Sequence, residues 1–271
     1  MMRLLRAVIA LLFVATLGLF GWTLYLQMKA DKTLPVISIE GDLIEVPLNA
    51  SETDLLAGVT AYDEKDGDLT EHVIVESISK FTETGVCKVY YAVCDHDDHV
   101  ASAFRKIRYQ GYTSPRFSMD RALCYSQMES VNVADVISAT DVLDGDISGN
   151  IILTSSDYEF GVTGAYSVKA EVSNSKGDQI SLSLPLFVED RSLNAPEITL
   201  SSYLIYVPKG TQIDPRTYFI SAKDSYDKDI SNTLFFENDY RPNEPGVYCF
   251  HYFAADELGR QGHSVLTVVV E

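Results

Sequence analysis

The chain has 271 residues, a hydrophobic content of 46% and a formal net charge of -18 at pH 7. This hydrophobic share excludes a wholly disordered chain, and the acidic balance excludes nucleic acid as a partner. Sixteen Tyr residues against a single Trp, together with many Val residues, favour strands over helices.

An apolar segment follows the first few residues. Residues 7–28 carry no charged side chain, and 22 helical residues at about 1.5 Å each cover the hydrocarbon core of a bilayer. Arg3 and Arg6 precede the segment, so residues 1–6 are expected to stay cytoplasmic while the remainder is exported. The sequence therefore predicts a single-pass protein of the cell membrane, with residues 7–28 as its membrane contact.

A cleaved signal peptide is the alternative interpretation of this segment. The apolar run is longer than a typical signal core, and no clear small-x-small cleavage site follows it. An uncleaved anchor is therefore the expectation.

The rest of the chain contains three copies of one pattern, D-x-x-D-x-D-[LI]-[ST]. The copies begin at Asp63, Asp141 and Asp224. Gly85, Gly164 and Gly246 follow the last Asp of each copy by 17, 18 and 17 residues, and ten residues later come Asp95, Asn174 and Asp256. Such matched offsets indicate a repeat of about 80 residues, which suits small β domains better than a solenoid.

Short alternating runs separated by turn residues predict about seven strands in each copy. The expected fold is all-β: three tandem immunoglobulin-like β-sandwich domains behind one N-terminal transmembrane helix. The domains are expected at 33–110, 112–190 and 195–271, hereafter the first, second and third segments. Short polar linkers at 111–114 and 190–195 predict a semi-rigid rod.

The motif order resembles a known family. A strand, A-x-D-x-x-D-G-D-[LI]-[ST], G-x-Y-x-V and a strand ending in D/N-x-x-G are similar to bacterial immunoglobulin-like repeats of the DUF5011 type, found in Gram-positive surface proteins and in a pesticidal crystal toxin. The first segment departs from the pattern at Cys87 and Asp98, and the third at Lys228. The resemblance implies surface display and a binding or spacer role, with no particular ligand.

The acidic motifs are the first candidates for chemistry. Carboxylates this closely spaced could bind Ca²⁺, and the alternative is that they organise a turn through backbone N–H groups. The turn is favoured, because an EF-hand-like set of ligands is missing. The calcium candidates are Asp63, Asp66, Asp68, Asp141, Asp144, Asp146, Asp224, Asp227 and Asp229.

Other motifs are interpreted as structural. The run Cys94–His99 contains metal-competent side chains but is expected to be a hairpin turn, and Tyr166 and Tyr248 occupy a tyrosine-corner position. Cys87 and Cys94 are too far apart along one strand to be bridged, and Cys124 and Cys249 each stand alone in their segment, so no dependence on disulfides is expected.

Sequence motifs of common enzyme classes, such as G-x-S-x-G and H-E-x-x-H, are missing. We therefore expect a non-catalytic surface spacer, adhesion module or protein-interaction module without a cofactor. The alternative is a protein that binds carbohydrate or cell wall through aromatic clusters such as Tyr90-Tyr91, Phe235-Phe236 or residues 248–252.

Overall fold

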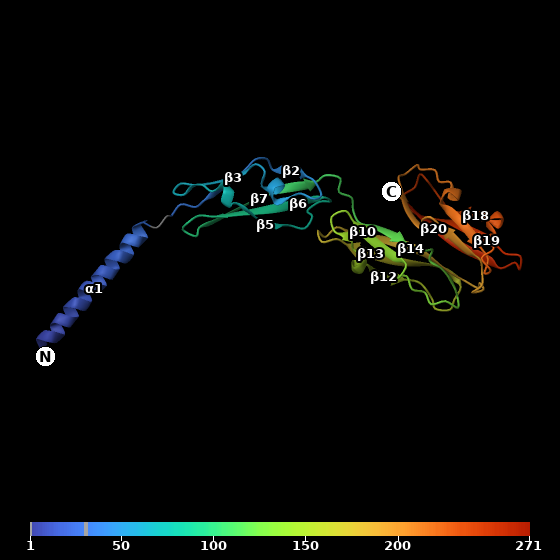
Figure 1. The fold of residues 1–271 in the computed structure, drawn as a ribbon, viewed down its shortest axis with the longest axis horizontal. Helices are drawn as coiled ribbons and strands as arrows, with labels where there is room; N and C mark the ends of the chain where they lie inside the picture. Colours follow the sequence, from blue (N-terminus) through green and yellow to red (C-terminus); the bar gives the residue numbers. More distant parts are fainter. Residues whose placement is uncertain (1, 30–31) are drawn as a thin grey trace. The chain divides into compact units, whose positions relative to one another are not determined.

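The computed structural model describes residues 2–29 and 32–271 (Figure 1), and within the N-terminal helix it describes the side chains of residues 9–25. The chain divides into two compact units, Met1–Gln110 and Gly111–Glu271. Strands are the commonest regular element in both units, which confirms the all-β expectation. The count of three domains stays a prediction.

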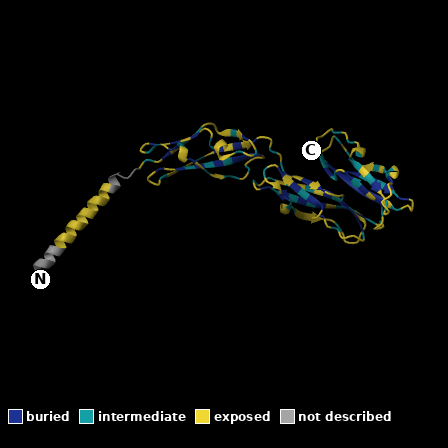
Figure 2. Cartoon of the chain, viewed as in Figure 1, coloured by how far each residue is buried: buried dark blue, intermediate teal, exposed yellow. Residues whose placement is uncertain are grey.

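Helix α1 spans Met2–Lys29 and includes the predicted segment 7–28. Its described side chains are exposed (Figure 2). Among the described residues, none of the helices combines the length and the apolar character that crossing a membrane takes. Residues 1–6 and both ends of segment 7–28 lie outside the described side chains.

Two sheets pack face to face in unit 1, with the strand orders β1-β3-β4 and β2-β7-β6-β5. Val59 and Ala61 from the first sheet and Val89 and Ile107 from the second are buried between them. The elements are β1 Val36–Ile39, β2 Leu43–Val46, α2 Glu52–Leu56, β3 Val59–Asp63, β4 Gly67–Asp68, η1 Thr70–His72, β5 Ile74–Ile78, β6 Val86–Cys94 and β7 Val100–Tyr109.

The second segment has the same plan, with the sheets β11-β10-β8 and β12-β13-β14-β9. Phe117 and Ala139 from one sheet and Val168 and Leu184 from the other share its core. The elements are β8 Arg116–Met119, β9 Cys124–Ser126, β10 Ile137–Asp141, β11 Gly145–Asp146, η2 Ser148–Asn150, β12 Ile152–Ser156, β13 Gly164–Ser173 and β14 Gln179–Glu189.

The third segment has the sheets β15-β17 and β16-β20-β19-β18. A single bridge between Lys223 and Asp229 stands where the other segments have the short strands β4 and β11. The elements are β15 Glu197–Leu200, β16 Leu204–Val207, η3 Pro215–Tyr218, β17 Phe219–Lys223, η4 Ser231–Thr233, β18 Phe235–Asn238, β19 Gly246–Ala255 and β20 Gln261–Val270.

Each segment changes sheets between its first two strands. The first strand pairs antiparallel in the smaller sheet, whereas the second strand pairs parallel with the last strand of the larger sheet, as β9 does with β14. The same pairing joins β2 to β7 and β16 to β20. The second strand thereby covers an edge of the larger sheet, whose backbone groups would otherwise lie unpaired.

Strand β20 is buried on both of its faces. Its residues Gly262 to Val268 are all buried, whereas β7 in unit 1 alternates between exposed and buried positions in its second half. Leu266 and Val268 face the core of the third segment, and Val265 on the opposite face packs against Cys124 of the second segment. Unit 2 is therefore held together by a packed junction between its two halves.

Tyr166 and Tyr248 lie two residues after Gly164 and Gly246 and hydrogen-bond to the preceding loops, as the motif predicts. The hydroxyl of Tyr166 donates to Val162 O at 2.9 Å, and that of Tyr248 donates to Glu244 O at 3.0 Å. A Cβ atom at Gly164 would lie 3.3 Å from the Tyr166 hydroxyl, so the ring occupies space that only glycine leaves open.

Removing either hydroxyl should cost little. Tyr166→Phe or Tyr248→Phe is expected to lower the free energy of unfolding of unit 2 by about 1 kcal/mol, because one hydrogen bond near the surface is lost. Hydrogen exchange of unit 2 peptides in urea measures the change. Tyr226→Phe is the control, because Tyr226 is 80% exposed; an equal loss in that variant would contradict the assigned role.

Candidate functional site

Each acidic motif organises a turn through hydrogen bonds to nearby backbone N–H groups. Oδ1 of Asp63 accepts from the backbone N–H groups of Lys65 and Asp66, at 2.8 and 3.0 Å. Asp141 accepts from the equivalent pair, Leu143 and Asp144, whereas Asp224 accepts from Tyr226 and Lys228. At the end of each motif, Asp68, Asp146 and Asp229 accept the N–H of the following Thr70, Ser148 or Ser231.

The middle carboxylates link this turn to the next hairpin. Asp66 accepts from the backbone N–H of His96, and Asp144 accepts from both the backbone and the hydroxyl of Ser175. Asp227 differs, because its backbone takes the left-handed conformation (φ 62°) that Gly67 and Gly145 take in the other two segments. Lys228 in place of glycine accounts for this one-residue shift.

In the described hydrogen bonds, each acidic motif contacts groups of its own segment. The carboxylate oxygens of Asp63 and Asp141 accept hydrogen bonds from protein donors, including Thr33 and Asn174. Over the residues that the structure describes, no group of three or more His, Cys, Asp or Glu is arranged to hold a metal ion. The hydrogen bonds show a turn role for these side chains, and calcium binding by the nine candidates stays a prediction.

The run Cys94–His99 forms the hairpin turn before β7. Asp95 is buried and its Oδ1 accepts from the backbone N–H groups of Asp97 and His99, while its Oδ2 lies 2.7 Å from Nδ1 of His99. Burial raises the pKa of Asp95, but these hydrogen bonds outweigh it and leave that pKa below its ordinary value. The side chains thus stabilise a loop.

A different cluster lies at the junction inside unit 2. The linker at 190–195 is fixed there by Arg191, whose guanidinium donates to Cys124 O at 2.9 Å and to His263 O at 3.2 Å. The hydroxyl of Ser126 in turn donates to Arg191 O at 2.8 Å. Arg191 therefore joins backbone groups of the second and third segments, and the linker is a structural part of the junction.

Two histidines continue the junction across the outer face of β19 and β20. Nδ1 of His251 lies 2.9 Å from Nε2 of His263, whose Nδ1 lies 2.6 Å from Oε1 of Glu189. The ring of Phe187 packs edge-on against His251, with the centroids 5.0 Å apart. Burial and the neighbouring His263 lower the pKa of His251 below its ordinary value.

This arrangement makes the stability of unit 2 depend on pH. Because the pKa of His251 is lower in the folded chain, the unfolded chain takes up a proton first, and stability falls as the pH drops below the ordinary 6.5. Burial raises the pKa of Glu189, but the contact with His263 outweighs it and leaves that pKa below 4.5, which adds a further loss in more acidic solution.

Urea denaturation of unit 2 between pH 7.5 and pH 5 measures this effect. The midpoint is expected to fall with pH in the native chain and to fall less steeply in His251→Gln. His72→Gln serves as the control, because His72 is exposed in unit 1. An unchanged slope in His251→Gln would refute the assignment.

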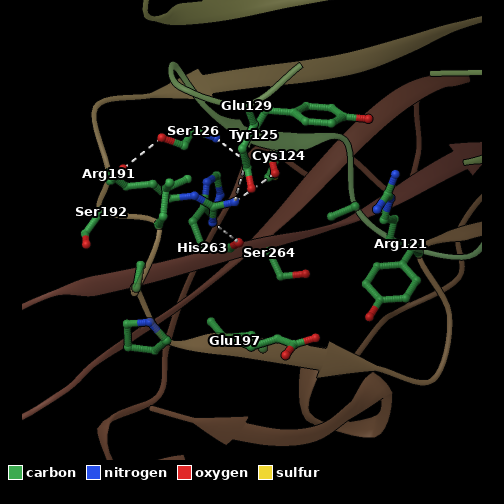
Figure 3. Close-up of a pocket in the computed structure, with 16 residues that line it drawn as sticks. Arg121, Cys124, Tyr125, Ser126, Glu129, Arg191, Ser192, Glu197, His263 and Ser264 are labelled. Carbon is green, nitrogen blue, oxygen red and sulfur yellow. Dashed lines mark hydrogen bonds and ion pairs between the residues drawn. The ribbon is translucent and has the colours of Figure 1, made fainter. Parts of the chain in front are cut away.

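A cavity of about 370 Å³ lies at the same junction (Figure 3). Arg121 and Glu129 of the second segment, Arg191 and Ser192 of the linker, and Glu197 and Ser264 of the third segment contribute to its lining. The two arginines offer fixed donors, the two glutamates offer acceptors, and the hydroxyls offer both. This lining suits a polar ligand rich in hydroxyl or amide groups.

Cys124 also lines this cavity, yet it is a poor nucleophile there. Burial raises the pKa of its thiol well above the ordinary value, and a thiol rather than a thiolate is the stable form. Cys124 and Cys249 each stand alone in their own segment, but the junction brings both into one buried cluster with Val265. Spacing within a segment could not reveal a contact between segments.

Sequence reasoning also missed Arg105, which is 2% exposed in the core of unit 1. Its guanidinium donates to Tyr91 Oη at 2.9 Å and to the carbonyls of Leu55 and Ala57, both at 2.7 Å. The corresponding register positions hold Leu184 and Leu266 in the other segments. Comparing the three copies residue by residue would have singled out this cation.

The chain is similar to two curated proteins. It is 26% identical over 246 residues to the pesticidal crystal protein Cry22Aa of Bacillus thuringiensis, a match that covers 86% of this chain and 33% of that protein. It is 29% identical over 165 residues to an uncharacterized 81.3 kDa protein of Acholeplasma phage L2, covering 55% of this chain and 22% of the other. The chain therefore spans a third or less of these relatives. No family model matches it.

Two solved structures are distant matches. A ZmpB structure from Clostridium perfringens, containing the M60 catalytic domain with two CBM51 domains, is 15% identical at a TM-score of 0.24, covering 89% of this chain and 31% of that chain. Drosophila N-cadherin EC1-4 is 12% identical at a TM-score of 0.22, covering 89% of this chain and 76% of that chain.

Proposed function

We propose that the chain is a non-catalytic surface protein whose immunoglobulin-like β-sandwiches act as a stiff spacer, adhesion module or protein-interaction module. The observation that carries this proposal is the junction in unit 2, where β20 is buried on both faces and Arg191 joins the two halves. A flexible linker would let the sandwiches move independently, whereas a packed junction transmits force and holds distance.

We also propose where in the cell the protein is located. Segment 7–28 would anchor the protein in the membrane, with residues 1–6 in the cytoplasm and the sandwiches outside. The charge-free sequence and the helix over Met2–Lys29 support this arrangement. Acidic surfaces on the sandwiches would also resist association with anionic lipid head groups.

Protease treatment of intact cells that express the full chain tests this arrangement. Residues 33–271 should be released, while a cytoplasmic marker stays intact, and N-terminal sequencing of the mature chain should begin before residue 7. Complete protection in intact cells with digestion after lysis would overturn the surface location. Mature chains beginning after residue 28 would overturn the anchor alone.

A second candidate function is binding of cell-wall glycan in the junction cavity. Its polar lining favours this, because sugar hydroxyls need paired donors and acceptors such as Arg121 and Glu197. The aromatic platforms proposed from the sequence are weaker candidates, because Tyr91 and Tyr252 are fully buried. Sedimentation of the full chain with insoluble peptidoglycan tests the cavity directly.

Arg121→Ala and Glu197→Ala should each reduce the sedimented fraction at least tenfold if the cavity binds the glycan. Both side chains are exposed, so the fold should persist. Arg241→Ala, which removes an exposed arginine outside the cavity lining, should bind as the native chain does. Equal binding by all of the variants would exclude the cavity as the glycan site.

A further inference from the structure

The junction of unit 2 brings two cysteines from different segments into one buried cluster. Cys124 lies on β9, Cys249 lies on β19, and Val265 completes the cluster, with Ala122 and Phe187 packed against it. Both cysteines are buried, with 9% and 7% of their surface exposed. The cluster joins residues far apart in the sequence, because the two cysteines are separated by most of unit 2.

The strand registers explain why they meet. Cys124 is paired with Phe187 in the parallel register of β9 and β14. The ring of Phe187 packs against His251, which follows Cys249 by two residues and so shares its face of β19. His251 is in turn paired with Val265, the third member of the cluster. Each link places the two thiols on the same patch of the junction.

We propose that Cys124 and Cys249 are an oxidisable pair that forms a disulfide between the second and third segments. Two S–H bonds break, one S–S bond forms and two protons are released. The two electrons reduce a disulfide oxidant, such as oxidised glutathione or a thiol–disulfide oxidoreductase, to two thiols. The bond would fasten the junction covalently beside the Arg191 contacts.

Oxidation is expected during folding, before the junction closes. Burial raises the pKa of both thiols, that of Cys249 to about 12, so the folded pair offers little thiolate to an oxidant. Asp239 adds to the effect on Cys249. A disulfide made at that stage would then be shielded from reductants by the same packing.

Refolding of the full chain in detergent with a glutathione redox buffer tests the pair. The informative variant is Cys87→Ser/Cys94→Ser, which retains only Cys124 and Cys249. After denaturation it should take up no iodoacetamide, and after reduction it should take up two equivalents. A cross-linked peptide containing both residues should appear in a non-reducing digest, and reduction should lower the Tm of unit 2 by about 5 °C or more.

Uptake of two equivalents before reduction would overturn the proposal. Cys124→Ser in the native chain is the second check, because its remaining three thiols should all be alkylated without reduction. In the cell, formation of the disulfide rests on the proposed surface location, because that location would supply the oxidant. If the bond forms on refolding but chains isolated from cells are reduced, the pair stands and the proposed location fails.

Discussion

Arg105→Ala is expected to destabilise unit 1 by about 3–5 kcal/mol, because it leaves a cavity and unpaired polar groups in the core. The guanidinium is the partner of Tyr91 Oη and of the two carbonyls at the end of α2, Leu55 O and Ala57 O. The hydroxyl of Tyr91 also donates to Leu55 O at 2.7 Å. One side chain thus connects the larger sheet to the loop that follows α2.

Hydrogen exchange in urea, read on unit 1 peptides, measures this loss. Arg108→Ala is the matched control, since Arg108 is exposed on the same strand. Arg105→Leu installs the residue type found at the corresponding positions of the other segments. It should recover part of the loss by filling space, while Ala57 O loses its donor and Leu55 O keeps only the hydroxyl of Tyr91. Full recovery by leucine would show that only volume matters at this position.

Gly262→Ala is expected to destabilise unit 2 by about 3 kcal/mol, because the added Cβ atom meets backbone. It would lie 2.1 Å from Pro196 O and 2.8 Å from the carbonyl carbon. Neither atom can turn away as a flexible side chain could, so β15 and β20 would have to separate. Glycine at this position permits the close approach of two backbones.

Gly149→Ala provides the comparison, because a Cβ atom there meets nothing within 4 Å and the backbone is not left-handed. Its midpoint in urea should stay close to that of the native chain. A loss in Gly262→Ala no larger than the loss in Gly149→Ala would rule out the steric explanation. Thermal unfolding should rank the two variants in the same order.

Local patterns predicted the repeated features of this fold. The acidic motif correctly placed a turn in each segment, because an Asp that accepts nearby N–H groups acts within a few residues, although the turn at Asp224 is shifted by one residue. The tyrosine-corner role of Tyr166 and Tyr248 could also be predicted, because each hydroxyl bonds to a carbonyl only four residues away. The parallel pairing of β2, β9 and β16 was not predicted, because it depends on contacts between strands far apart in the sequence.

The junction was beyond local reasoning. The predicted polar linker at 190–195 gave no sign that Arg191 donates to carbonyls on both sides of it. The run V-L-T-V-V-V at the end of the chain did carry a signal. A continuous apolar run departs from the alternation expected of a strand with one solvent-exposed face. It indicates that both faces of the strand are covered, as the structure shows for β20.

The two-sided burial of β20 also limits how this protein could exchange parts with other genes. If recombination moved residues 195–271 alone, Val265, His251 and Cys249 would become exposed to solvent, because the second-segment residues that cover them would be missing. The second segment would meanwhile keep Phe187 and Cys124 without their counterpart. Residues 111–271 would therefore have to be transferred together for the junction to stay buried, although the sequence period is half that size.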